Sequence, residues 1–224
     1  EQYVEERLKA AKNDEEKITC LKTFANMGSI DSLAQVIRPY MAKTESKIVR
    51  IEAINSLIYL GIQDQLQVLQ TLMPIMMNRN EETSVRVAAF VVLMKCRSST
   101  PLVELQKCLN EEPDVEFKTF VVQYMKNFLE KQEQQDLRHQ MRIRETLKSV
   151  RAFRMSYRTS DWQMLYGWNS QGEMIKTSRV WNSSGSIPEY ASSRHYTQWN
   201  GQYNHFIEFG YRAEGMEELF NPSS

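Results

Sequence analysis

The feature that most constrains the fold is a short phrase that occurs twice in the chain. VRIEAINSL spans Val49–Leu57 and VRVAAFVVL spans Val85–Leu93, so the two copies begin 36 residues apart. A weaker copy, VEFKTFVVQY, begins at Val115, 30 residues further along the chain. Self-similarity with a period of roughly 20 to 50 residues is the signature of a repeat protein, in which each repeat is one supersecondary unit.

A second repeated phrase indicates what each unit contains. GSIDSLAQVIRPYM begins at Gly28 and GIQDQLQVLQTLMPIM begins at Gly61, and each glycine follows an apolar run. Glycine commonly takes the left-handed conformation that ends a helix. The apolar residues of Val49–Leu60 recur at helical spacing, which predicts an amphipathic helix. We therefore predict stacked helical hairpins, because one hairpin cannot bury its apolar face alone.

An arginine occupies the same place in both copies of the first phrase. Arg50 follows Val49, and Arg86 follows Val85. Two cations at matching repeat positions suit either a ligand site or a structural ion pair. We interpret both as members of a surface or inter-repeat salt bridge.

The pattern changes after Val150. Alternating aromatic and polar residues replace the helical spacing, and alternation with period two is typical of half-buried strands. WQMLYGW (162–168) and EMIKTSRVW (173–181) are joined by the turn sequence NSQG, which predicts a hairpin. FRMSYR (153–158) and HFIEFGYRAEG (205–215) are further strand candidates, and residues 182–193 are predicted to form a loop.

The sequence thus predicts an α+β chain in two domains. Residues 1–150 are expected to form the C-terminal part of an α-helical-hairpin superhelix, a HEAT-like horseshoe. Residues 151–224 are expected to form antiparallel opening strands of a larger sheet that the chain does not complete, because a few strands in about 75 residues make a poor free-standing core.

Two strands are predicted to carry one apolar face each. Alternation places Met164, Tyr166 and Trp168 on one face of the first hairpin strand. It places Ile207, Phe209 and Tyr211 on one face of the last strand. Each face can pack against the helices or line a surface that binds lipid, and both alternatives remain open from the residues alone.

Two further features bear on the compartment. The three cysteines are too few for a disulfide framework, and Cys96 and Cys108 can either pair across neighbouring helices or remain buried thiols. Asn182-Ser183-Ser184 is a glycosylation acceptor triplet in the expected loop. A glycan or a disulfide would favour secretion.

The sequence does not contain a recognisable set of active-site or metal-binding residues. The histidines are scattered, no Cys/His cluster has the spacing of a zinc site, and no nucleophile elbow or phosphate-binding glycine loop occurs. We therefore expect no catalytic residue and no metal. Lys+Arg 28 balance Asp+Glu 28, which argues against nucleic acid as a partner.

No stretch approaches the roughly 18 apolar residues that a transmembrane helix needs. The charged opening EQYVEERLKAAKNDEEK does not have the pattern of a signal peptide. We expect that the chain begins within a longer protein.

Several phrases resemble the large lipid-transfer protein superfamily, which includes vitellogenins, apolipophorins, apolipoprotein B and the microsomal triglyceride transfer protein. CLKTFANMGSIDSL, from Cys20, is similar to the family form LKxxGNxG, with Ala25 where glycine often stands. SVRVAAFVVLMK, from Ser84, is similar to VRxAAFxxL. MSYR (155–158) looks like the short strand after the family's helical domain, and HFIEFGYRAEGMEELF (205–220) is similar to FEIGxRxEGxxxLL in its first lipid-facing sheet.

The resemblance implies a lipid transport or storage protein, secreted into haemolymph or yolk, in which a helical horseshoe braces a β-sheet cavity. An arthropod-type vitellogenin or clottable lipoprotein is the favoured subtype. It implies no covalent cofactor, with phospholipid and neutral lipid bound in the cavity. The implied partners are lipids, the remaining segments of the same lipoprotein and a lipoprotein receptor, with no nucleic acid and no transmembrane segment.

Two other functions remain open from the sequence. Stacked helix pairs commonly bind proteins, so a cytosolic HEAT-type interaction scaffold with an unrelated β domain is one alternative. The other is a lipoprotein that is cross-linked through Gln and Lys side chains during clotting, for which EKQEQQ (130–135) would supply glutamines.

Overall fold

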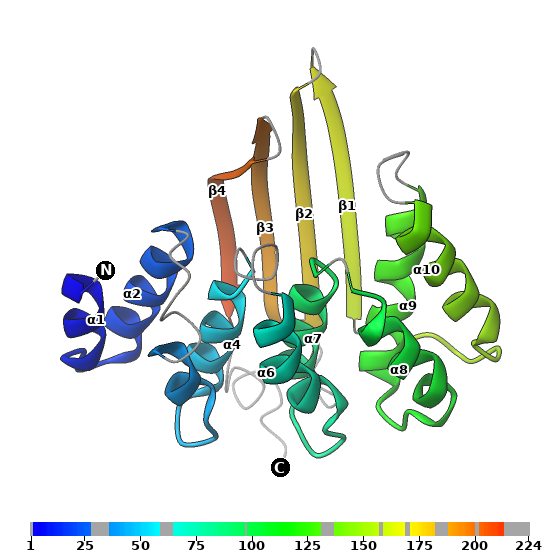
Figure 1. The fold of residues 1–224 in the computed structure, drawn as a ribbon, viewed down its shortest axis with the longest axis horizontal. Helices are drawn as coiled ribbons and strands as arrows, with labels where there is room; N and C mark the ends of the chain where they lie inside the picture. Colours follow the sequence, from blue (N-terminus) through cyan, green and yellow to red (C-terminus); the bar gives the residue numbers. More distant parts are fainter. Residues whose placement is uncertain are drawn as a thin grey trace, which may run out of the picture. The chain divides into compact units, whose positions relative to one another are not determined.

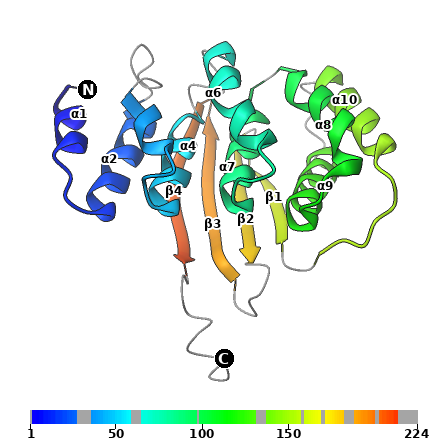
Figure 2. The same ribbon diagram turned by 90° about the horizontal axis from the view of Figure 1, so that it is seen from below.

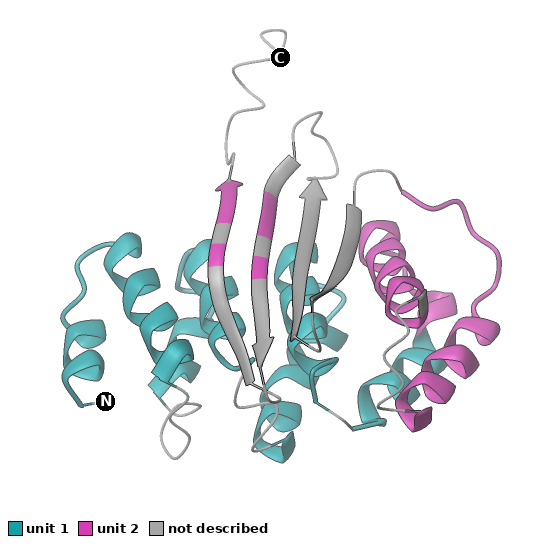
Figure 3. Ribbon diagram, turned by 90° about the horizontal axis from the view of Figure 1, so that it is seen from above, with its two compact units in different colours: residues 1–108 teal, residues 109–224 magenta. Residues whose placement is uncertain are grey.

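The computed structural model describes most of the chain, and it forms two compact units, residues 1–108 and 109–224 (Figure 3). Within the strands, side chains are described at residues 191–193, 195, 207 and 209–211. The described residues are 2–27, 36–58, 65–96, 98–130, 137–156, 159–168, 171–181, 188–199 and 202–212.

The described part of the first unit is helical (Figure 1). The two strong copies of the repeated phrase form α4 and α7, which pack against each other. α6 and α7, which the expected linker between repeat units joins, also pack together. The elements are α1 (Gln2–Lys9), α2 (Asp14–Met27), η1 (Arg38–Met41), α4 (Lys47–Ser56), α6 (Gln65–Met77), α7 (Thr83–Leu93) and α8 (Thr100–Cys108).

The repeated phrase has a structural cause, because the same two positions of each copy are buried. Ala53 and Ile54 in α4, like Ala89 and Phe90 in α7, have no exposed surface. A small residue followed by a large apolar one lets the neighbouring helices approach and then fills the space between them. The repetition therefore reflects one packing solution used twice.

The repeated arginines are buried too, and each binds a backbone carbonyl near the end of the preceding helical segment. Arg50 Nε donates to the Met41 carbonyl at 3.0 Å, and Arg86 Nε donates to the Met76 carbonyl at 3.0 Å. The last carbonyls of a helix have no partner within it, so a buried cation there satisfies them.

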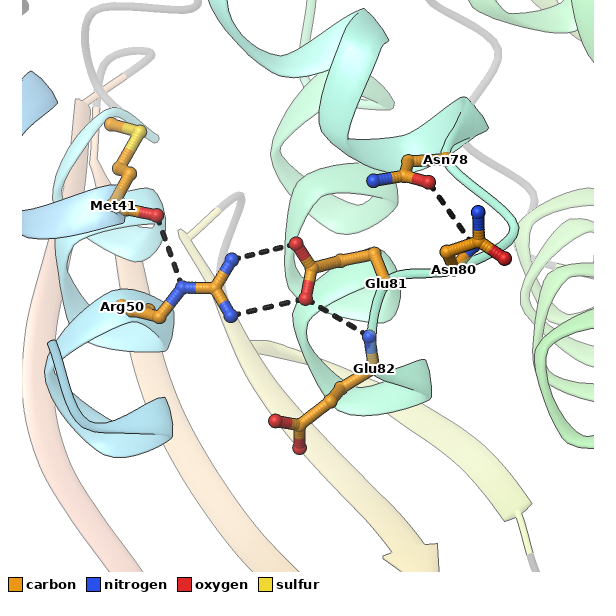
Figure 4. A network of polar contacts seen from close by, with 6 residues as sticks. All are labelled: Met41, Arg50, Asn78, Asn80, Glu81 and Glu82. Carbon is orange, nitrogen blue, oxygen red and sulfur yellow. Dashed lines mark hydrogen bonds and ion pairs between the residues drawn. The ribbon is translucent and has the colours of Figure 1, made fainter. Parts of the chain in front are cut away.

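Arg50 also forms an ion pair with Glu81, which lies just before α7 (Figure 4). Arg50 Nη1 and Nη2 donate to the two Glu81 carboxylate oxygens at 3.0 and 2.7 Å. Both side chains are 6% exposed. The inter-repeat salt bridge predicted for Arg50 is therefore present, but it is buried rather than on the surface.

The environment of Glu81 favours its charged form. Burial raises the pKa of Glu81, but hydrogen bonds from Arg50 and from the Glu82 backbone N–H, together with the Arg50 charge, outweigh burial. The pKa consequently lies below the ordinary value of 4.5. When folding lowers the pKa of a carboxyl group, the ionised group stabilises the fold at pH values above its unfolded pKa. That contribution is lost as pH falls through the folded pKa.

The second unit contains two long helices and a four-stranded sheet. The strands lie in the order β1-β2-β3-β4, and every neighbouring pair is antiparallel (Figure 2). α10 packs against α9, and α9 packs against β1. The elements are η2 (Leu109–Glu111), α9 (Val115–Glu130), α10 (Leu137–Ser149), β1 (Thr159–Trp168), β2 (Gln171–Trp181), β3 (Pro188–Trp199) and β4 (Gln202–Arg212).

The segment between α10 and β1 is fixed to the helical part of this unit by polar contacts. Asn110 Nδ2 donates to the Ser149 carbonyl at 2.9 Å, and Asn110 Oδ1 accepts from the Arg151 backbone N–H at 2.8 Å. Thr119 Oγ1 accepts from the Ser156 backbone N–H at 2.9 Å. These side chains supply hydrogen-bond partners to a backbone segment that lies in neither a helix nor a sheet.

The structure confirms the fold class, with helices followed by antiparallel strands, and corrects two details. Residues 153–156 were expected to begin a strand, but they are irregular, and the Ser156 N–H binds a threonine side chain instead of a strand. Residues 188–193 were expected in a loop, but they begin β3, where β2 and β4 pair with them on either side. The compact units divide at residue 108, and the expected domain boundary at residue 150 stays a prediction.

Replacing Glu81 with Gln should destabilise the first unit. The change leaves the buried Arg50 guanidinium without its counter-charge, for which we expect a loss of about 3–5 kcal/mol in the free energy of unfolding at neutral pH. The difference from the unsubstituted protein should shrink as pH falls from 4.5 through the lower folded pKa of Glu81, because the carboxylate that pairs with Arg50 is lost over that range. Urea unfolding at about pH 7 and about pH 3 measures both effects.

Glu104→Gln is the matched control for this substitution. Glu104 binds Lys107 at 2.7 Å, but the two side chains are 38% and 65% exposed. An exposed pair of this kind is worth about 0–1 kcal/mol. Equal losses for the two variants would contradict a structural role for the buried pair.

Candidate lipid-facing surface

The strand register brings the two predicted apolar groups onto one face of the sheet. Residues directly opposite each other in an antiparallel pair share a face. Met164 pairs with Ile175, Ile175 pairs with His195, and His195 pairs with Ile207. Met164 and Ile207 therefore occupy the same cross-strand row, although 42 residues separate them in the sequence.

The remaining predicted residues follow from alternation along each strand. Tyr166 and Trp168 stand two and four residues after Met164 in β1, and Phe209 and Tyr211 follow Ile207 in the same way in β4. The exposure of the side chains of Met164, Tyr166 and Trp168 lies outside the described part of the structure.

The three β4 side chains are exposed. Ile207 is 39% exposed, Phe209 60% and Tyr211 48%. Large apolar residues in single exposed positions are normal on protein surfaces, whereas a contiguous row of them marks an interaction site. We call these three residues the β4 apolar row.

The β3 residues opposite the β4 apolar row are small or polar. Ala191 faces Tyr211, Ser193 faces Phe209, and His195 faces Ile207. The Phe209 and His195 rings meet edge to face, with centroids 6.4 Å apart. Small residues next to large ones leave the large side chains standing above the sheet, which accounts for their exposure.

The described side chains of the β4 apolar row and its β3 neighbours include few groups that could catalyse a reaction or bind a metal ion. His195 is the titratable side chain of β3 described here, and it contacts the Phe209 ring. Within the described residues no group of three or more His, Cys, Asp or Glu side chains can hold a metal ion. The surface has the chemistry to contact an apolar ligand.

Of the two alternatives left open for Cys96 and Cys108, a disulfide or free thiols, the structure has both cysteines as free thiols. The Cys96 thiol donates to the Val92 carbonyl at 3.9 Å, and the Cys108 thiol donates to the Leu105 carbonyl at 3.9 Å. Each thiol is thus directed at the turn that precedes it rather than at the other cysteine. Burial raises the pKa of the Cys96 thiol to about 11.

The predicted glycosylation site, Asn182, lies outside the described residues. No helix in the described ranges is both long and apolar enough to cross a bilayer. The β3 residues that adjoin the β4 apolar row were missed by sequence reasoning. Their only sequence signal was weak alternation around Tyr190 and His195, which the serines between them obscured.

Comparison with protein families gives a match over the helical part of the chain. The family described as Vitellogenin TPR domain matches residues 1–126, more than half of the 224 residues. The chain belongs to the vitellogenin TPR domain family. The resemblance to the large lipid-transfer superfamily is thereby confirmed at the level of vitellogenin.

Curated relatives extend this similarity to nearly the whole chain. It is 26% identical over 222 residues to Vitellogenin-1 of Gallus gallus and 25% identical over 218 residues to vitellogenin of Ichthyomyzon unicuspis. It is 20% identical over 212 residues to Vitellogenin-6 of Oscheius tipulae. The matches cover 92–93% of this chain but only 12–13% of each relative. The favoured arthropod subtype stays a prediction.

A solved structure described as "Lipid-protein interactions in lipovitellin" has the same fold. It matches all of this chain with a TM-score of 0.84 and 21% sequence identity, and the match covers 25% of that chain. At this identity the likeness shows the fold alone. The fold likeness therefore includes both the helices and the strands.

Cys96 should resist alkylation in the folded protein. With a pKa of about 11 for this buried thiol, only about 0.1% is thiolate near pH 8, and the thiolate is the reactive form. We expect Cys20, which is partly exposed, to be labelled by iodoacetamide while Cys96 is not. Peptide mass spectrometry before and after denaturation provides the measurement. Labelling of Cys96 at the rate of Cys20, or a Cys96–Cys108 linked peptide, would contradict this assignment.

Proposed function

We propose that this chain is part of a secreted lipid transport or storage lipoprotein of the vitellogenin type and has no enzymatic activity. The strands contribute a wall that contacts phospholipid and neutral lipid, and the stacked helices support that wall. The β4 apolar row is the observation that carries the proposal, because three large apolar side chains lie exposed side by side.

The physical basis for lipid contact is burial of apolar surface. Fully burying a side chain such as Ile or Phe is worth about 1.5–3 kcal/mol, and no directional polar contact is needed. The register supports a wider surface than β4 alone, since Met164 falls in the row of Ile207. Tyr166 and Trp168 would extend this surface along β1.

The sequence similarity supports the carrier over the other functions. The relatives are named vitellogenins, and the fold match is to a structure described by its lipid–protein interactions. The remaining lipoprotein segments, a lipoprotein receptor, secretion into yolk or haemolymph, and a glycan on Asn182 belong to this same proposal. A cytosolic scaffold would purify without lipid, which makes lipid content the decisive observation.

The proposal is tested by the lipid content of the full-length protein. Solvent extraction followed by mass spectrometry should find phospholipid and neutral lipid in stoichiometric amounts. The double substitution Ile207→Asp with Phe209→Asp should lower the lipid content at least about tenfold, because two charges replace side chains that bury against lipid.

Leu66→Asp is the matched control. Leu66 lies in α6 and is 65% exposed, so the substitution places a charge on a similarly exposed apolar position that belongs to a helix and not to a strand. Its lipid content should equal that of the unsubstituted protein. A lipid-free native protein, or equal lipid content in all three proteins, would overturn the proposal.

A further inference from the structure

A dense group of cations lies on α10 and the segment after it. Residues 137–154 contain six basic residues and a single acidic one, Glu145, in a chain whose formal net charge is +0. All six basic residues are exposed. We call this group the α10 basic face, which consists of Arg138, Arg142, Arg144, Lys148, Arg151 and Arg154.

Helical spacing separates α10 into a buried side and an outer side. His139, Ile143 and Thr146 are buried, and the Phe128 and His139 rings meet edge to face at 5.3 Å. The outer stripe follows the spacing i, i+4, i+7, i+11 and therefore lies on one side of the helix. Its members are Leu137, Met141, Arg144 and Lys148.

The outer stripe combines charge with exposed apolar surface. Leu137 is 66% exposed and Met141 58%. Arg144 and Lys148 continue the same stripe toward the end of the helix. Helices that lie in a membrane interface use basic residues to attract anionic headgroups and apolar residues to enter the bilayer boundary, and this stripe offers both kinds of side chain.

Structural needs within the second unit account for only part of this charge. Arg142 pairs with Glu145 at 3.1 Å, and Lys148 in the last turn complements the helix dipole. Among the residues that the structure describes, neither explanation applies to Arg138, Arg144, Arg151 and Arg154. These four exposed cations occur within residues 138–154, and like charges concentrated in one segment favour a negatively charged partner.

The surface is held in place before any partner binds. α10 packs on α9, and Asn110 binds the Ser149 carbonyl and the Arg151 N–H across the end of the helix. Farther along, Lys118 lies over the Phe153 ring, with its ammonium 4.5 Å from the ring centroid. The backbone on either side of Arg151 and Arg154 is thus fixed, and little ordering entropy opposes docking.

We propose that the α10 basic face docks onto a membrane surface that carries anionic phospholipid headgroups. The arginines and lysine would approach the headgroup phosphates and carboxylates, while Leu137 and Met141 enter the interface between them. An acidic polypeptide would satisfy the cations, but it gives the exposed Leu137 and Met141 no comparable apolar environment. This contact is separate from the proposed lipid wall, since it uses polar headgroups and a different part of the chain.

The test uses the full-length protein and sedimentation with two kinds of vesicle, phosphatidylcholine alone and phosphatidylcholine with about one third phosphatidylserine. We expect binding to the anionic vesicles only, and weaker binding at high salt. Each basic residue near an anionic surface is worth about 1 kcal/mol, or about fivefold in affinity. Arg144→Gln with Lys148→Gln should therefore weaken binding about 25-fold.

Lys12→Gln with Arg79→Gln is the matched control, because it removes the same charges from exposed positions outside the α10 basic face. It should leave vesicle binding within about twofold of the unsubstituted protein. Leu137→Ser with Met141→Ser should also weaken binding, with the salt dependence unchanged.

Three outcomes would overturn this proposal. They are equal binding to both vesicles, equal loss in the α10 and control variants, and binding to soluble polyglutamate without binding to anionic vesicles. Extraction of the same variants separates this proposal from the lipid wall. The lipid content should not change when Arg144 and Lys148 are replaced, whether or not docking is lost.

Discussion

The first unit depends on a buried arginine that joins consecutive repeats. A stack of helical hairpins buries apolar faces well, but every helix end leaves carbonyl groups without partners. Arg50 and Arg86 bring a donor to such carbonyls at Met41 and Met76. Arg50 is then neutralised by Glu81, so the polar connection lies within the apolar layer without an unpaired charge. The same arrangement gives each repeat a defined place on the one before it.

The second unit meets a different requirement, the change from helix to strand. The segment that connects α10 to β1 is irregular, so its backbone N–H and C=O groups lack the partners that a helix or sheet provides. Side chains from the helical part hydrogen-bond with these groups instead. The Asn110 side chain donates to one backbone carbonyl and accepts from one backbone N–H, as a peptide group would. Thr119 Oγ1 accepts from the N–H of Ser156. These contacts hold residues 149–156 on the helical part of the unit shortly before β1 begins.

The helices could be predicted because burial leaves a clear periodic signal in the sequence, as at Ala53–Ile54 and Ala89–Phe90. The burial of Arg50 could not, because its partner is a backbone carbonyl, which every residue possesses. β3 was missed because Ser192 and Ser193 interrupt the alternation, and its strand conformation depends on pairing with both neighbours. The apolar groups of β1 and β4 were each predictable, but their shared face required the register through β2 and β3.

Among the described side chains of the second unit, the β4 apolar row and the α10 basic face differ in character, and the two proposals assign them to lipid in two physical states. The β4 apolar row suits acyl chains, whose transfer from water is favourable and is not screened by salt. The α10 basic face suits headgroups, whose attraction is electrostatic and screened within about 10 Å at moderate salt. Acyl chains are accessible only once lipid has left the bilayer, whereas headgroups are accessible while it remains there. If both proposals hold, the protein approaches a membrane through the α10 basic face and retains lipid through the β4 apolar row.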